Sequence, residues 1–318
     1  MDRALDLNAA GAKLTPPFPP IVLNRAARRP GSRLRVVLLN AAGGKRFREI
    51  VACLKRPALQ GADVILLCEV NAGTKPSAGR DVAAEMAAML EMSCAYIREF
   101  GVRNPDGEIV GYMGNAILSA APFDDVAAVA LYNPRTPRML RRERHWSRVG
   151  TPTGVVTRMK FGGRELTVGL AHLHSRCTPA QRARQMATFL ESFPTQGRAV
   201  FGGDLNTTTT ELSNGSQLWA TARQMIANPA RFRAPQAYEP LFDNLREHGL
   251  EIDGVNVPNR PTFTFSGLIP RSMRPKLDWL AIRELRPIAG TAAVVTPRSP
   301  TLLRRVSDHD FVTVDLEL

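Results

Sequence analysis

Cysteine is scarce in this sequence, and the few that occur lie far apart. Only four are present among 318 residues, and no two of them form a C-x-x-C pair. The four are Cys53, Cys68, Cys94 and Cys177. Three of them lie in apolar or helix-like stretches, where a free cysteine behaves as a small hydrophobic side chain. The spacing therefore argues against a zinc site and against a disulfide framework.

Long hydrophobic runs are also missing. No run of about 18 uncharged apolar residues occurs, so we expect no membrane-spanning segment. Residues 1–20 contain Asp2 and Asp6 and lack the apolar stretch that a secretory signal needs. We therefore expect a soluble protein of the reducing cytoplasm.

Acidic residues are outnumbered by basic ones, 29 against 42, which gives a formal net charge of +13. A strongly basic surface attracts anions such as nucleic acid, anionic lipid or phosphorylated metabolites. An arginine-rich composition without any anionic partner produces the same excess. Hydrophobic residues make up 44% and charged residues 22%, which is typical of a folded globular protein and excludes a wholly disordered chain.

Short apolar runs that alternate with helix-like stretches indicate an α/β fold. The runs 34–39 and 64–67 are almost continuously apolar, as in strands that are covered on both faces. Helical spacing is found over 45–56, 81–92 and 179–190. Further strands are predicted at 112–118, 155–161, 166–172, 199–201, 277–282, 292–296 and 311–316.

No linker or internal repeat divides these elements, so we expect one layered domain with sheet against sheet inside and helices outside. Residues 1–31 are set apart, because closely spaced prolines and arginines interrupt any regular pattern there. We therefore predict a flexible N-terminal extension over 1–31 and a single domain over 32–318.

Polar side chains stand at the ends of the predicted strands, where α/β enzymes place their sites. Asn40 ends the first strand and Glu69 the second. A carboxylate at the end of a buried strand needs a partner, because an isolated buried charge is very costly. Taken alone, Glu69 is more simply explained by an ion pair with an arginine at the rim of the sheet.

A second carboxylate lies in the sequence GGDLN at 202–206, directly after an apolar run. Residues i and i+2 of an extended segment share a face, so Asp204 and Asn206 point the same way. The glycines before them allow a close approach of the backbone. A turn in which Asn206 or Thr207 caps a helix is the simpler alternative for this motif by itself.

The sequence SDHD at 307–310 precedes the last predicted strand. Asp308 is suited to bind a divalent metal, and His309 to handle a phosphate or a proton. A carboxylate that is hydrogen-bonded to one imidazole nitrogen fixes the tautomer and stabilises the protonated ring. We expect Asp278 to be this partner of His309, with Asp310 as the competing candidate.

Two more histidines end another strand, in the sequence AHLHS at 171–175. Under a repeat of two, His172 and His174 share one face. The spacing does not decide which of them faces a site.

Seven motifs in this order resemble those of the endonuclease/exonuclease/phosphatase superfamily, which has the fold of deoxyribonuclease I. They are LLN at 38–40, LLCEV at 66–70, GNAILS at 114–119, AHLHS at 171–175, GGDLNT at 202–207, KLDWLAI at 276–282 and SDHD at 307–310. The resemblance covers the chain from about residue 33 onward. It implies a four-layer α/β/β/α sandwich, with two mixed β-sheets packed face to face and helices outside, and a catalytic domain over 32–318.

The resemblance also implies which residues hold a metal. Glu69 is the principal metal carboxylate, and Asn40 and Asp308 contribute directly or through water. The expected ion is Mg²⁺, with Mn²⁺ as an alternative, because a hard cation bound through few carboxylates keeps a position open for phosphate.

The remaining motif residues receive catalytic or supporting roles by the same resemblance. Asp204 orients or deprotonates the attacking water, and Asn206 holds a phosphate oxygen. His309, paired with Asp278, stabilises the charge that develops in the transition state. His172 contacts the scissile phosphate, with His174 as the second choice for this role. Asn115 supports the site and binds substrate.

Arginines gather in a few short segments. Six of them, Arg141 included, lie within 134–148 beside Trp146, whose planar ring is suited to stack on bases. Others, Arg274 included, lie just before the predicted catalytic residues of the last two motifs. We expect Arg141 and Arg274 to bind a phosphate-containing polyanion, with nucleic acid favoured.

The predicted function is thus a Mg²⁺-dependent phosphoric ester hydrolase, a phosphodiesterase or nuclease that cleaves nucleic acid by in-line attack of an activated water. The first alternative is the same chemistry on a phospholipid headgroup or a small phosphorylated metabolite. The second is a non-catalytic binding module of the same fold. No protein partner is inferred.

Overall fold

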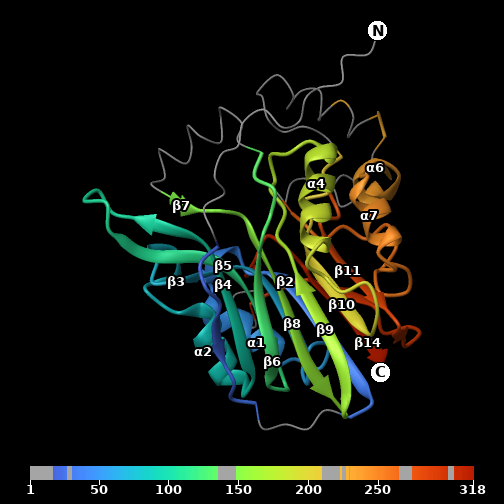
Figure 1. The fold of residues 1–318 in the computed structure, drawn as a ribbon, viewed down its shortest axis with the longest axis horizontal. Coiled ribbons are helices and arrows are strands. Elements are labelled where there is room, and N and C mark those ends of the chain that lie inside the picture. Colours follow the sequence, from blue (N-terminus) through green and yellow to red (C-terminus); the bar gives the residue numbers. More distant parts are fainter. Residues whose placement is uncertain are drawn as a thin grey trace.

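Two β-sheets, one of nine strands and one of five, form the centre of the molecule (Figure 1). The computed structural model describes residues 17–26, 31–134, 148–209, 223, 227–228, 230–264, 274–299 and 304–318. The larger sheet consists of β1 (Ile21–Leu23), β2 (Arg33–Asn40), β3 (Val64–Ala72), β4 (Ser93–Arg103), β5 (Ile109–Ser119), β7 (Arg148–Gly150), β12 (Arg286–Pro287), β13 (Ala293–Val295) and β14 (Phe311–Glu317). The smaller sheet consists of β6 (Phe123–Ala130), β8 (Thr153–Phe161), β9 (Arg164–Leu170), β10 (Ala199–Asp204) and β11 (Asp278–Arg283).

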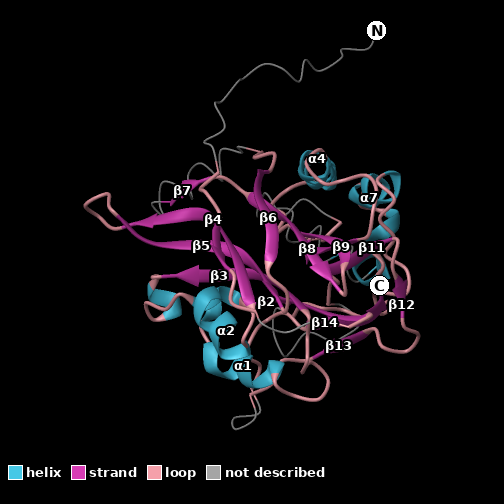
Figure 2. Ribbon diagram, turned by 60° about the horizontal axis from the view of Figure 1, so that its bottom comes forward, coloured by secondary structure: helices cyan, strands magenta, loops and turns pink. Residues whose placement is uncertain are grey.

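Helices cover the outer faces of both sheets. Figure 2 shows α1 (Phe47–Leu54) and α2 (Val82–Leu90) on one side of the strands and α4 (Pro179–Leu190) and α7 (Leu241–Glu247) on the other. The short elements are α6 (Ala230–Arg233), η1 (Ala42–Gly44), η2 (Lys75–Ser77) and η3 (Pro235–Ala237). The order helix, sheet, sheet, helix confirms the predicted α/β/β/α sandwich. None of the described helices has the length and hydropathy needed to cross a membrane.

Both sheets are mixed, as predicted. The larger one runs β1-β4-β5-β3-β2-β14-β12, with β7 beside β4 and β13 beside β14. Its strands β2 and β3 are parallel, and its other pairings are antiparallel. The smaller sheet runs β11-β10-β9-β8-β6, in which only β9 and β10 are parallel.

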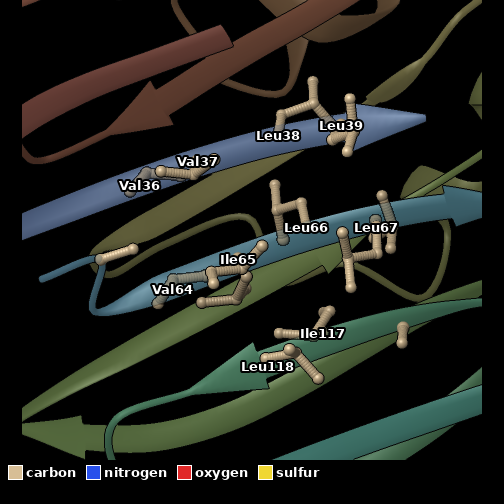
Figure 3. Close-up of a cluster of buried hydrophobic side chains, with 14 of the residues drawn as sticks. Val36, Val37, Leu38, Leu39, Val64, Ile65, Leu66, Leu67, Ile117 and Leu118 are labelled. Carbon is tan, nitrogen blue, oxygen red and sulfur yellow. The ribbon is translucent and has the colours of Figure 1, made fainter. Parts of the chain in front are cut away.

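The apolar runs of β2 and β3 make up much of the core. Val36–Leu39 and Val64–Leu67 are almost fully buried, and they lie side by side with Ile117 and Leu118 of β5 (Figure 3). Strands β2 and β3 contact β10 of the other sheet on one face, while α2 packs on β3 from outside. Because both faces of these strands are covered, neither face meets water. The residues of both faces are therefore apolar, which explains the continuous hydrophobic run.

The strand register brings four polar residues to one edge of the sandwich. Asn40 of β2 is level with Cys68 of β3, the residue before Glu69. In the other sheet, Asp204 at the end of β10 is level with Asp278 at the start of β11. Strands β10 and β11 both contact β2 across the interface between the sheets. The packing of the core therefore decides how closely these side chains meet.

The first described residues extend the larger sheet. Strand β1 lies within the predicted N-terminal extension and pairs with β4, with Ile21 opposite Tyr96. Asn24, just after β1, exchanges two hydrogen bonds with the backbone of Phe123, at 3.1 and 2.9 Å. The described part of 1–31 is thus attached to both sheets. The division of the chain at residue 31 stays a prediction.

We predict that Gly203→Ala weakens the fold. A Cβ atom at residue 203 would lie 1.8 Å from the backbone oxygen of Ala171, which follows β9 directly and is held by the hydrogen bond from its N–H to the Gly202 oxygen. The expected loss of unfolding free energy is about 2 kcal/mol or more, measured by urea denaturation. Gly31→Ala is the control, because a Cβ atom there meets nothing within 4 Å. Equal stability of the two variants would contradict the prediction.

Candidate active site

Asn40 joins the polar strand ends into one cluster. Its Nδ2 donates to Glu69 Oε1 at 3.2 Å and to Asp204 Oδ2 at 3.0 Å. The amide is itself oriented, because its Oδ1 accepts a hydrogen bond from the Ala42 N–H at 3.0 Å. The hydroxyl of Ser307 donates to the Asn40 backbone oxygen at 2.7 Å. Asn40 therefore connects both sheets and the loop that carries His309.

Glu69 occupies an irregular position in β3. The pairing of β3 with β5 shifts between Leu67 and Val70, and Glu69 has a φ of 52°. This left-handed backbone is uncommon for a residue with a long side chain. A bulge of this kind turns a side chain away from the regular pleat, and such strain is concentrated at functional sites. The Glu69 N–H donates to Asn115 Oδ1 at 3.2 Å, so the buried Asn115 supports the bulge.

Asp204 is buried between two imidazole rings. Its Oδ2 lies 3.6 Å from His172 Nε2 and 3.6 Å from His309 Nε2. Its Oδ1 accepts the N–H of Asn206 at 3.1 Å. Burial raises the pKa of Asp204, although the two histidines act in the opposite direction. The carboxylate is thus held at the centre of a group of proton donors.

His309 is paired with Asp278 and not with its chain neighbour Asp310. The distance from His309 Nδ1 to Asp278 Oδ2 is 2.8 Å, and Asp278 is fully buried. Asp310 instead accepts a hydrogen bond from Arg305 at 2.7 Å. Burial disfavours a charged ring, but Asp278 and Asp204 outweigh it and raise the pKa of His309 to about 10. The geometry therefore favours a positively charged His309 at neutral pH.

The structure distinguishes the two histidines of the 171–175 motif. His172 faces Asp204, and although burial opposes the shift, Asp204 and Glu69 raise the pKa of His172. His174 lies outside this cluster, where its Nδ1 accepts the N–H of Arg176 at 3.1 Å. Its own N–H donates to Gln185 at 3.1 Å.

Glu99 is a member of the site that the sequence analysis missed. It is a buried carboxylate of β4, and burial raises its pKa to about 7, with His172 opposing that shift. Its Oε1 accepts the N–H of Thr153 at 3.2 Å. We had predicted no strand over 93–103. An acid in the inward series of Ala95 and Ile97 would have been the signal once that strand was recognised.

The remaining predicted residues lie in different surroundings. The buried Asn206 uses its side-chain Nδ2 to donate to the Leu173 backbone oxygen at 2.8 Å. Asp308 is exposed and accepts a hydrogen bond from Ser307 Oγ at 3.4 Å. Arg274 donates to Thr264 Oγ1 at 3.3 Å. The Thr264 N–H in turn donates to the backbone oxygen of Asp308. Arg141 lies outside the described residues.

Oxygen ligands for a hard cation are present on one side of the cluster. The carboxylates of Glu69 and Asp308 are the donor type that Mg²⁺ and Mn²⁺ prefer, whereas Asn40 turns its Nδ2 toward Glu69 and its Oδ1 toward the Ala42 N–H. A second group of described residues, Asp204, Asp278 and His309, has ligand atoms within 4.8 Å of one another. In that group His309 Nδ1 and Asp278 Oδ2 are already bonded to each other. That bond engages two of the ligand atoms of this group, whereas Glu69 Oε1 accepts from a neutral amide, so the Glu69 carboxylate fits a resident cation better.

Comparison with known proteins agrees with this arrangement. The model of the Endonuclease/Exonuclease/phosphatase family matches residues 37–309. A comparison with curated proteins finds no match.

Solved structures with a similar fold share little sequence with this chain. An endonuclease/exonuclease/phosphatase from Beutenbergia cavernae has 17% identity and a TM-score of 0.58, over 91% of this chain and 72% of that one. Danio rerio TDP2 in complex with a single-strand DNA product has 16% identity and a TM-score of 0.54, over 91% and 100%. The human Nocturnin catalytic domain with bound sulfate has 15% identity and a TM-score of 0.54, over 95% and 98%. The family model spans every residue from Asn40 to His309 that forms the cluster, and the chain belongs to the Endonuclease/Exonuclease/phosphatase family.

Proposed function

We propose that this protein is a metal-dependent phosphoester hydrolase that cleaves nucleic acid. The observation that carries the proposal is the buried Asp204 carboxylate, which lies 3.6 Å from two imidazoles while a buried Asp278 holds one of them. A carboxylate and two imidazoles around one point suit the attack of water on a phosphodiester, in which negative charge increases on the phosphoryl oxygens.

Each side chain of the cluster has a role in this chemistry. Asp204 accepts a hydrogen bond from the attacking water and aligns it. His309 donates from Nε2 to a phosphoryl oxygen, while Asp278 holds its Nδ1 proton. His172 contributes a second donor from the opposite side of Asp204. Asn206 has one amide hydrogen left for a phosphate oxygen after its bond to Leu173.

A divalent cation would be held by Glu69, Asn40 and Asp308. When bound, Mg²⁺ or Mn²⁺ would supply charge neutralisation to the phosphoryl and leaving oxygens. The half-exposed Glu69 carboxylate is the central ligand in this assignment, because the bulge in β3 directs it away from the regular strand. Asn40 couples that ligand to Asp204 through its Nδ2 hydrogen bonds.

Nucleic acid is the substrate that the charge of the chain favours. The net charge of +13 suits a polyanion, and we assign Arg274 and Arg141 to phosphates beside the cleaved one. The Danio rerio relative was crystallised with a single-strand DNA product, which supports a DNA or RNA strand as substrate here. A phospholipid headgroup, a small phosphate ester and a catalytically inactive module are the outcomes that a substrate panel separates.

Asp204→Asn is expected to lower kcat by about 100-fold or more, because it removes the group that aligns water. The measurement is hydrolysis of single- and double-stranded DNA, RNA, sphingomyelin vesicles and p-nitrophenyl phosphate with Mg²⁺ or Mn²⁺, and chelation by EDTA should abolish it. Asp125→Asn is the control, since Asp125 forms an exposed pair with Arg158. Activity that survives both Asp204→Asn and EDTA would refute the proposal.

Salt should distinguish a nucleic-acid substrate from a small one. Affinity for a DNA or RNA strand should fall steeply between about 50 and 200 mM salt. The reason is that protein binding releases cations from the phosphates, and this release is less favourable at higher salt. Arg274→Met should reduce the slope of log KM against log salt. A KM for the cleaved nucleic acid that does not change with salt would exclude Arg274 and other basic residues as phosphate contacts.

His309 is expected to titrate near pH 10 in the protein without added metal. Its raised pKa means that the charged ring is present below that pH and is lost above it. Asp278→Asn removes the main attractive charge and should shift the titration to lower pH. Ring chemical shifts in NMR measure both values. Titration of His309 near the ordinary histidine value in the unmodified protein would contradict the assignment of charge.

A further inference from the structure

The loop that carries Asp204 and Asn206 has an unfavourable backbone. Both Asn206, with a φ of 48°, and Thr209, with a φ of 58°, are non-glycine residues in the left-handed region. Such conformations persist only where the surrounding structure holds them, and they cost about 1–3 kcal/mol each. The contacts of Thr209 therefore bear on the position of Asn206.

A fully buried ion pair supplies the first of these contacts. Glu239 Oε1 accepts the backbone N–H of Thr209 at 2.7 Å. The Glu239 carboxylate is held by two hydrogen bonds from Arg182, at 3.0 Å from Nε and 2.5 Å from Nη2. Both side chains have 0% exposure.

The place of Arg182 in the sequence of α4 makes this pair unusual. Arg182 lies one and two turns before Met186 and Phe189, on the face of the helix that packs into the core. A buried ion pair contributes little to stability compared with apolar side chains of the same size, because both charges lose their water. A charge that breaks the apolar pattern without a gain in stability points to a functional reason.

Arg231 contacts the same residue from a more exposed direction. Its Nη2 donates to the Thr209 backbone oxygen at 2.9 Å, and its Nε donates to Thr209 Oγ1 at 3.0 Å. The backbone N–H, the backbone oxygen and the Oγ1 of Thr209 are thus all hydrogen-bonded, the first to Glu239 and the other two to Arg231. Three residues before Thr209, the Asn206 N–H donates to Asp204 Oδ1 at 3.1 Å.

We propose that Arg182 and Glu239 are positioning residues that hold the Asp204–Thr209 loop in its strained conformation and thereby fix Asp204 and Asn206. This inference rests on the proposed function, because it assigns the loop to a hydrolytic site. Neither residue touches the reacting atoms. Glu239 acts through the backbone N–H of Thr209, and Arg182 holds Glu239 while also donating from Nη1 to the Cys177 backbone oxygen.

Two double variants that differ at one position test the proposal. Arg182→Met/Glu239→Gln removes both charges but keeps an oxygen that accepts the Thr209 N–H. Arg182→Met/Glu239→Leu removes that acceptor as well. The second variant should lose about 100-fold in kcat at nearly unchanged KM, because a displacement of about 1 Å has this effect. The kcat of the glutamine variant should be at least about tenfold higher than that of the leucine variant.

The control is Asp243→Asn/Arg246→Gln, which breaks an exposed ion pair on α7 close to Glu239 in the chain. It should leave kcat unchanged. Equal kcat in the glutamine and leucine variants would overturn the proposal. If neither folds, Arg231→Met decides: a several-fold lower kcat at unchanged KM supports the tether, and an unchanged kcat or a raised KM overturns it.

Hydrogen exchange of the Asn206 amide separates this proposal from the proposed function. The amide should exchange faster in the leucine variant than in the glutamine variant, while the amides of the β10 strand stay protected. A wild-type protein that hydrolyses no phosphoester would refute the function and leave this exchange result valid. Equal protection of Asn206 in both variants would overturn the positioning role even in an active enzyme.

Discussion

The two hydrogen bonds from the Asn40 amide are the interaction on which the site depends. They join Glu69 of the larger sheet to Asp204 of the smaller one, at 3.2 and 3.0 Å. A bond of that length between two sheets requires their separation to be fixed to within a fraction of an ångström. That separation is set by the apolar side chains of β2, β3 and β10, so the packing of the core sets the geometry of the polar cluster.

Burial then determines the charges at this point. Asp204 and Glu99 both have raised pKa values because they are removed from water, and the neighbouring histidines have raised pKa values because these acids surround them. The same low-dielectric surroundings strengthen the hydrogen bonds that these groups make with one another. In our proposal the hydrogen bond from Thr209 to Glu239 matters for the same reason, because charged groups act on a ligand only when they are held in a fixed geometry.

The sequence predicted the strands that are covered on both faces, because continuous apolar runs leave few other structures open. Strand β4 was missed, since its apolar run over 94–97 is only four residues long and is followed directly by Arg98 and Glu99. Glu99 was missed with it. The expected partners of His309 illustrate the remaining gap: Asp310 is adjacent in the chain, yet Asp278 makes the 2.8 Å contact. Adjacent side chains of an extended segment point apart, so the nearer residue in sequence was the farther in space.

The order of the motifs by itself predicted the family and the layered fold, and it named Asn40, Glu69, Asp204, Asp278 and His309, which the structure brings together. Only the tertiary structure decided which of His172 and His174 faces Asp204, which acid pairs with His309, and that the Arg182–Glu239 pair contacts Thr209. The physical reason is that residue type and spacing report which groups are available and on which face of a strand they lie. Distances between side chains of different sheets depend on how two apolar faces pack, and no local pattern contains that information.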